Sequence, residues 1–188
     1  MRKKASGIGP YQWAAIVFLL AVTISAALSL GSQILLSGAG LWAALVILII
    51  FILLGIVFDM IGMAAASADL KILNSMASRK VRGAKEAIVL VKNAGRVSSV
   101  CNDVIGDICG IVSGVTGAVI VLYLSSYWES VPGILLSVSV TAFISGFTIG
   151  GKALSKTYAI RRGTQVIWFA GRFLRLFKFK NNNKKIKK

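Results

Sequence analysis

The side chains best suited to chemistry gather at the start of the third long apolar segment. Asp103 and Asp107 lie four residues apart, on one face of a helix, and Asn102 directly precedes them. Ser98 comes one turn earlier, and Ser113 lies deeper in the apolar segment. Carboxylates, amides and hydroxyls all offer oxygen, the ligand atom that hard cations such as Mg²⁺ prefer. The sequence therefore predicts a divalent-cation site in which Asn102, Asp103 and Asp107 supply oxygens and Ser98 or Ser113 completes the shell.

The same acids have a second interpretation. A carboxylate at membrane depth is costly and usually faces a polar cavity, an ion or a base. At the cytoplasmic interface, by contrast, Asp103 and Asp107 would pair with Arg96 or Lys92 and bind no ion. Asp59, at the end of the second apolar segment, has the same two interpretations, and the sequence leaves both open.

Composition excludes most other site chemistry. The chain has no histidine and two cysteines, so neither a Cys/His zinc site nor a Ser-His-Asp triad can form. Cys101 and Cys109 are eight residues apart, which by itself makes no disulfide framework. Outside the acids, no nucleophile, base and orienting group can be grouped, so we expect that the protein is not an enzyme.

Four apolar segments must position these residues. The chain of 188 residues is 56% hydrophobic and 15% charged, far from the balance of an ordinary soluble domain. Uncharged runs of about 18 residues or more can cross a bilayer as helices. We predict an all-α integral membrane protein with four transmembrane helices in two hairpins, the spans lying at about residues 13–30, 41–60, 105–127 and 131–151.

Basic residues set the expected orientation. None of the 22 Lys and Arg lies in the link within either hairpin. The positive-inside rule therefore places both termini, and the stretch between the hairpins, in the cytoplasm. That stretch is predicted to form short cytoplasmic helices over about residues 64–100. The alternative interpretation of the first span is a cleaved signal peptide with small residues near Ala26 and Ala27.

The sequence after the fourth span is strongly basic. Residues 155–178 mix bases with Trp168 and phenylalanines, as in a juxtamembrane helix at the membrane interface, and residues 179–188 form a polybasic tail. We expect this helix to contact the lipid bilayer and its anionic headgroups, with a merely solubilising tail as the alternative. No folded reader module accompanies the charge, so no nucleic-acid partner is expected. Residues 1–178 then form a single membrane domain.

Small residues recur at every fourth position in the third and fourth spans. Such rows let helix backbones approach closely in lipid. They predict that the two spans pack along Gly106, Gly110 and Gly114 on one side and Ala142, Gly146 and Gly150 on the other.

Several segments follow one another in the order of a known transporter family. A span ends in a turn of Phe and small residues at 58–66, a basic helical pair follows at 68–93, and Cys-Asn-Asp-Val-Ile-Gly-Asp occupies 101–107. This order, over about residues 45–178, resembles the transmembrane module of the CNNM/CorC magnesium and cobalt transporters. Residues 101–107 are similar to that family's Cys-Ser-Leu-Leu-Leu-Gly-Asn segment. The resemblance implies a homodimer, and we expect a bacterial cytoplasmic membrane as its setting.

The chain departs from the family's pattern at the ion site. The family's Gly-Glu-x-x-Pro, whose Glu contributes to that site, falls near residues 146–150, where Phe147 replaces the Glu and the proline is missing. Asn102 stands near the position of the family's site Ser, and Asp107 near that of its Asn. The family's paired CBS domains have no counterpart in these residues.

These features support one expectation and leave others open. We expect a CNNM/CorC-like membrane protein that binds or transports a divalent cation, with Mg²⁺ first. The alternative is a non-transporting scaffold or regulator of the same fold, which the missing Glu favours. A holin-like, membrane-perturbing protein fits only loosely, because the long cytoplasmic stretch between the hairpins does not suit it.

Overall fold

The computed structural model describes residues 10–36, 40–128 and 130–185. This part of the chain is helical apart from short turns, and four of its helices are long and apolar enough to cross a membrane. The elements in order are α1 (Pro10–Leu36), α2 (Gly40–Ser67), α3 (Leu70–Ser78), α4 (Ala84–Lys92), α5 (Ala94–Ser98), η1 (Ser99–Ile105), α6 (Gly106–Tyr127) and α7 (Gly133–Lys185). The predicted all-helical fold, with four helices long and apolar enough to span a membrane, is confirmed. Parts of both predicted hairpin links (37–39 and 129) and the end of the polybasic tail (186–188) lie outside the described residues.

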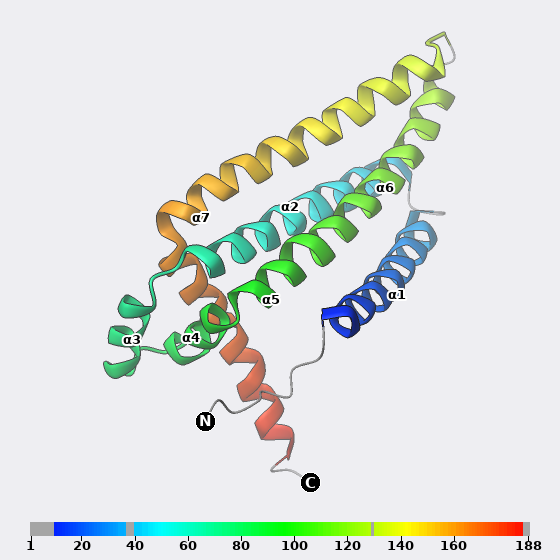
Figure 1. Cartoon of the computed structure of the whole chain (residues 1–188). Coiled ribbons are helices and arrows are strands. Elements are labelled where there is room, and N and C mark those ends of the chain that lie inside the picture. The colour runs from blue at the N-terminus through cyan, green and yellow to red at the C-terminus, as the bar shows by residue number, and fades with distance from the viewer. Residues whose placement is uncertain (1–9, 37–39, 129, 186–188) are drawn as a thin grey trace.

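Helix α2 lies at the centre of the bundle (Figure 1). It contacts α6 and α7, whereas α1 contacts α6 more extensively than it contacts α2, its neighbour in sequence. Glycines permit these close approaches: a Cβ on Gly55 would stand 3.2 Å from Cβ of Cys109, and one on Gly62 would overlap the amide of Asn102. The membrane part of the core is therefore arranged around one face of α2.

The third span is a composite helix. Helices α5, η1 and α6 run on without a break from Ala94 to Tyr127, and η1 is a π-helix. A π-helical turn inserts extra backbone into a helix and shifts the face that follows it, and such turns are frequent at functional sites. Here the turn lies where the sequence analysis places its oxygen-bearing residues.

The glycine rows do not pack as predicted. A Cβ on Gly110, Gly114, Gly146 or Gly150 would meet nothing within 4 Å. Helices α6 and α7 diverge (Figure 1), because α6 turns another set of residues inward. That buried set includes Gly106, Cys109, Ser113 and Gly117, and α7 approaches it at two places: a Cβ on Gly117 would stand 2.5 Å from Cδ1 of Ile144, and one on Gly106 would stand 3.6 Å from Nζ of Lys152.

The helices α3 and α4 form a second layer with the end of α2 and the second half of α7. Ala65, Leu73, Ala87 and Ile167 make up its buried apolar cluster. Asp69 caps α3, because its Oδ1 accepts a hydrogen bond of 2.7 Å from the backbone N–H of Lys71. This layer lies at one end of the spans (Figure 1).

Helix α7 changes direction at Arg162, whose backbone leaves the helical region at φ −124° and ψ 24°. The next residue, Gly163, packs so closely on α2 that a Cβ there would stand 2.6 Å from Oγ of Ser67. Ser67 in turn donates a hydrogen bond of 3.1 Å to the carbonyl of Ala159. The kink lets α7 leave the membrane part of the bundle and then cover α4.

Candidate cation site

Asp59 is the acid that the fold buries. It lies on α2 within the second span and is 4% exposed. Its Oδ2 has no hydrogen-bond partner within the described part of the chain. Because a carboxylate removed from water is costly unless a charge or a donor offsets it, this oxygen is available to a cation.

Asn102 reaches α2 from the π-helix. Its Nδ2 donates a hydrogen bond of 3.3 Å to Oγ of Ser98, which fixes the amide so that Oδ1 is its remaining acceptor. Oδ1 is buried and has no hydrogen-bond partner among the described residues. Room for this amide exists because residue 62 is glycine, where any Cβ would overlap it.

The two acceptor oxygens belong to the same contact between helices. Gly55, Asp59 and Gly62 share one face of α2, since they are spaced by four and three residues. Gly55 lies against Cys109 of α6 and Gly62 against Asn102 of η1, so the α2 face that carries Asp59 is turned toward the third span. We call this contact the α2–η1 interface. Its α2 side carries the Asp59 carboxylate and its η1 side the Asn102 amide oxygen, and among the described residues neither Oδ2 of Asp59 nor Oδ1 of Asn102 has a hydrogen-bond donor.

A cation would satisfy both oxygens. Mg²⁺ takes oxygen ligands, needs few side chains and keeps several waters, so one carboxylate, one amide and one hydroxyl are a sufficient protein contribution. Among the described residues, no three His, Cys, Asp and Glu side chains form a metal-binding group. A site at the α2–η1 interface would therefore rely on Asp59, Asn102 and Ser98 together with water.

The structure separates the residues singled out from sequence. Ser98 and Asn102 are hydrogen-bonded at the α2–η1 interface. Asp103 and Asp107 are exposed on another face of the same helix, where Asp103 accepts a hydrogen bond of 3.0 Å from Oγ of Ser99. Ser113 lies two turns beyond Gly106 and is buried, and its Oγ has no described partner. The role of the two exposed acids as ligands stays a prediction.

Sequence reasoning did not include Asp59 among the ligands. Its signal was present, because Gly55, Asp59 and Gly62 place two small residues and one acid on a single face of an otherwise apolar helix. Such a face marks where another backbone approaches closely. Read together with its position inside a span, the pattern would have favoured Asp59 over Asp103.

One base lies close to the interface. Lys152, which is half-buried on α7, brings its Nζ to 3.6 Å from the position that a Cβ would take on Gly106. An ammonium at this place would repel a cation bound at the interface, or would act there as the counter-charge of the carboxylate. The sequence analysis did not single out this residue.

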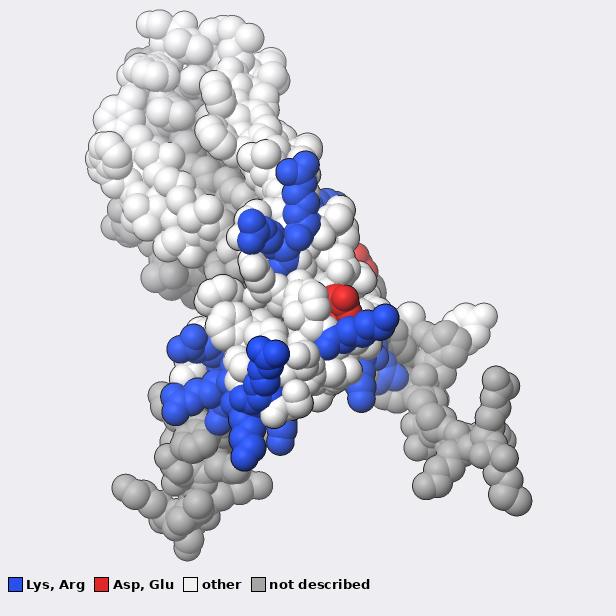
Figure 2. All heavy atoms as spheres, turned by 90° about the vertical axis from the view of Figure 1, so that its left-hand side faces the viewer, with Lys and Arg blue, Asp and Glu red and all other residues white. Residues whose placement is uncertain are grey.

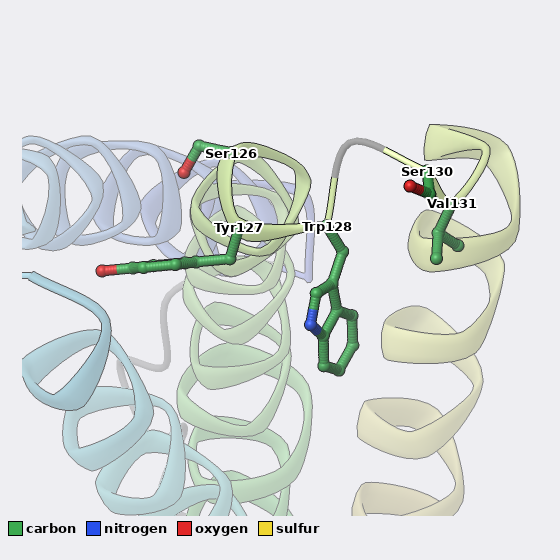
Figure 3. Close-up of a pocket in the computed structure, with 5 residues that line it drawn as sticks. All are labelled: Ser126, Tyr127, Trp128, Ser130 and Val131. Carbon is green, nitrogen blue, oxygen red and sulfur yellow. The ribbon is translucent and has the colours of Figure 1, made fainter.

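Two other hollows are less suited to chemistry. A groove of about 270 Å³ between α6 and α7 carries hydroxyls of Ser113, Thr141 and Ser145 beside the glycines of α6. A hollow of about 610 Å³ lies at the turn between α6 and α7 (Figure 3). There the ring of Tyr127 points away from Trp128, and both aromatic residues are exposed, as aromatic side chains at a membrane interface are.

Comparisons with known proteins found no relative of this chain. No protein-family model, no curated protein and no solved structure matches the chain.

Proposed function

We propose that this chain is an integral membrane protein that binds and transports a divalent cation, Mg²⁺ first, at the α2–η1 interface. The observation that carries the proposal is the pair of buried acceptors without partners, Oδ2 of Asp59 and Oδ1 of Asn102. Their burial between two membrane-spanning helices makes an ion the simplest group that offsets both. Transport would be a shift between conformations open to either side, each biased by the bound ion.

We further propose that both termini lie in the cytoplasm of a bacterial cell, with the spans in two hairpins in its cytoplasmic membrane. Lys and Arg gather at one end of the molecule, over α3, α4 and the second half of α7, while the visible part of the spans is free of them (Figure 2). The positive-inside rule assigns that end to the cytoplasm. Exposed Phe169 and Phe173 on α7 support its contact with the bilayer and anionic headgroups.

We propose a homodimer as the working unit. Gly110 and Gly114 on α6, and Gly146 and Gly150 on α7, are exposed and meet nothing within 4 Å. Rows of small residues that face lipid are typical of helix–helix interfaces in membranes. A second copy would cover such rows and bring Asp107, on the same side of α6 as Gly110 and Gly114, to the contact.

The proposed kinship with CNNM/CorC transporters then involves an altered site. Phe147, at the position of the family's Glu, is 69% exposed on α7 and offers no ligand atom. In this proposal Asp59 supplies the carboxylate in its place.

A scaffold or regulator is the second candidate, and Lys152 is the observation that favours it. If the ammonium of Lys152 acts as the counter-charge of the α2–η1 interface, the protein would keep the fold and bind no ion. Mg²⁺ would stabilise the folded protein if the interface binds a cation, and would have no specific effect if Lys152 is the counter-charge.

The test is thermal unfolding of the detergent-purified chain in a titration with Mg²⁺, with Ca²⁺ and K⁺ as comparisons. A ligand that binds only the folded state stabilises it by RT ln(1 + [L]/Kd), about 2.7 kcal/mol at a hundredfold excess over Kd. Asp59→Asn removes the buried carboxylate, and Asp107→Asn makes the same chemical change on the exposed face. Flux of Mg²⁺ into liposomes then separates transport from binding.

The outcomes assign the site. We expect stabilisation specific for Mg²⁺ that Asp59→Asn abolishes and Asp107→Asn retains. Loss in Asp107→Asn alone would place the ion at the face predicted from sequence. No stabilisation of the unaltered chain would overturn the proposed cation function and leave the scaffold.

A further inference from the structure

A basic cavity lies in the second layer, the one formed by α3, α4 and the second half of α7, away from the α2–η1 interface. It measures about 330 Å³ and lies between the α3–α4 turn and the second half of α7. Among the described residues, three bases from three segments line it, namely Lys80, Lys85 and Arg175, and Glu86 is the one acid in its wall. Figure 2 shows this end of the molecule as the one where Lys and Arg gather.

Backbone contacts hold the walls of this cavity in place. Gly83 has φ +89°, and a Cβ on it would stand 2.7 Å from both N and Cα of Arg172. Directly before Arg172 in α7, a Cβ on Gly171 would stand 2.6 Å from the backbone N of Ala87, one turn beyond Gly83. Trp168 adds a hydrogen bond of 3.0 Å from its Nε1 to the carbonyl of Arg82. Two glycine contacts and one indole therefore fix α7 against the turn, so the three bases are presented by a rigid frame.

The electrostatics of the cavity suit a phosphate group. Three cations face one carboxylate, and α4, a helix of nine residues, begins at the cavity with Gly83 as an N-cap that has no side chain to cap it. The first-turn N–H groups and the positive end of the helix dipole add to the field of the side chains. The volume lies at the lower end of the range for small-molecule sites, about 300–1,000 Å³, which suits a headgroup.

We propose that this cavity binds the phosphate group of an anionic phospholipid headgroup. A lipid is favoured over a soluble phosphate because the residues around Arg175 on α7 are apolar and exposed, as in an interfacial helix: Phe173, Leu174 and Leu176. The cavity is thus a defined headgroup site within a basic surface. The inference stands apart from the proposed cation function, since it shares no residue with the α2–η1 interface.

The experiment titrates the detergent-purified full chain with dihexanoyl phosphatidylglycerol and follows binding by calorimetry. Dihexanoyl phosphatidylcholine and inorganic phosphate are the comparison probes. The cavity variant carries Lys80→Gln and Arg175→Gln. Its matched control carries Lys71→Gln and Lys92→Gln, which removes the same charge from exposed bases of α3 and α4 that do not line the cavity.

We expect saturable binding of phosphatidylglycerol that the cavity variant weakens by about tenfold or more, because each lost base removes a charge-assisted hydrogen bond. The control should change binding by less than about twofold, since exposed charges at a distance are screened. Glu86→Gln should tighten binding, because it removes the one acid from the wall. If the double variant fails to fold, Lys85→Gln, a single change within α4, tests the same site, and it should also weaken the binding of phosphatidylglycerol.

Three results would overturn the inference in whole or in part. Equal weakening by the two double variants would show general attraction of charge with no site. Absence of saturable binding to the unaltered chain would remove the site altogether. Inorganic phosphate that binds as tightly as the lipid, and competes with it, would keep the phosphate site and overturn the lipid as its source.

Discussion

Gly62→Ala is the substitution that tests the α2–η1 interface most directly. The new Cβ would overlap Oδ1 of Asn102 and stand 2.8 Å from its Cγ, so the amide must move or the helices must separate. Overpacking of this kind costs about 1–3 kcal/mol. Alanine gains about 1 kcal/mol over glycine in a helix, which leaves a net loss of roughly 0–2 kcal/mol. The same movement takes Oδ1 away from the ion, so the Kd for Mg²⁺ should rise as well.

A double-mutant cycle with Asn102→Ala isolates this contact. The free energy of unfolding is measured by titration with SDS in mixed micelles for the unaltered chain, both single variants and the double variant. Once the amide is gone, Gly62→Ala has nothing to overlap, so its cost should vanish in the Asn102→Ala background. We expect the double variant to be less destabilised than the sum of the two single variants by about 1 kcal/mol or more. A coupling of this size is within the range found for residues in contact.

A control glycine and an additive cycle complete the design. Gly31→Ala makes the same chemical change on α1, where a Cβ would meet nothing within 4 Å, and should not destabilise the protein. Additive effects of Gly62→Ala and Asn102→Ala would show that the amide does not occupy the space beside Gly62. That result would refute the α2–η1 interface as described and, with it, the cation site.

Three further predictions concern the buried carboxylate of Asp59, the nearby base Lys152 and Gly83 in the second layer. Asp59→Asn should raise the stability of the metal-free protein by about 1 kcal/mol in the same SDS titration, because it removes an unpartnered buried charge, while it abolishes the response to Mg²⁺. Lys152→Met should tighten Mg²⁺ binding about tenfold, the equivalent of about 1.4 kcal/mol of repulsion removed. Loss of stability of the metal-free protein in Lys152→Met would instead identify Lys152 as the permanent counter-charge. Gly83→Ala should destabilise by about 2 kcal/mol or more in thermal unfolding, because its φ of +89° and the backbone of Arg172 both exclude a Cβ, whereas Gly95→Ala, with open space around it, should not.

The spans could be predicted from sequence because length, hydropathy and the absence of charge are properties of single segments. The face that each helix buries could not be predicted in this way, because it depends on how the helix is rotated in the bundle. The π-helical turn Ser99–Ile105 makes this harder, since it shifts the helical phase between Ser98 and Gly106. A uniform α-helical spacing therefore favoured Asp103 and Asp107, whereas the structure turns Asn102 toward α2 and leaves both acids exposed. The glycine rows were misassigned for the same reason, because small residues occur on more than one face of α6.

The α2–η1 interface and the second layer are joined through the last three turns of α2. Asp59 and Gly62 lie at the α2–η1 interface, and only one turn further on Ala65 and Ser67 contact the second half of α7. Any movement of α2 that opens the space around Asn102 must therefore shift Ser67 against Gly163, where a Cβ would stand only 2.6 Å from Oγ. Because packed interfaces of this kind move as units, the kink of α7 at Arg162 is the place where such a movement would reach the basic cavity. If ion and lipid are coupled in this way, linkage requires the effect to be reciprocal: phosphatidylglycerol must change the Kd for Mg²⁺ by the same factor as Mg²⁺ changes that for the lipid.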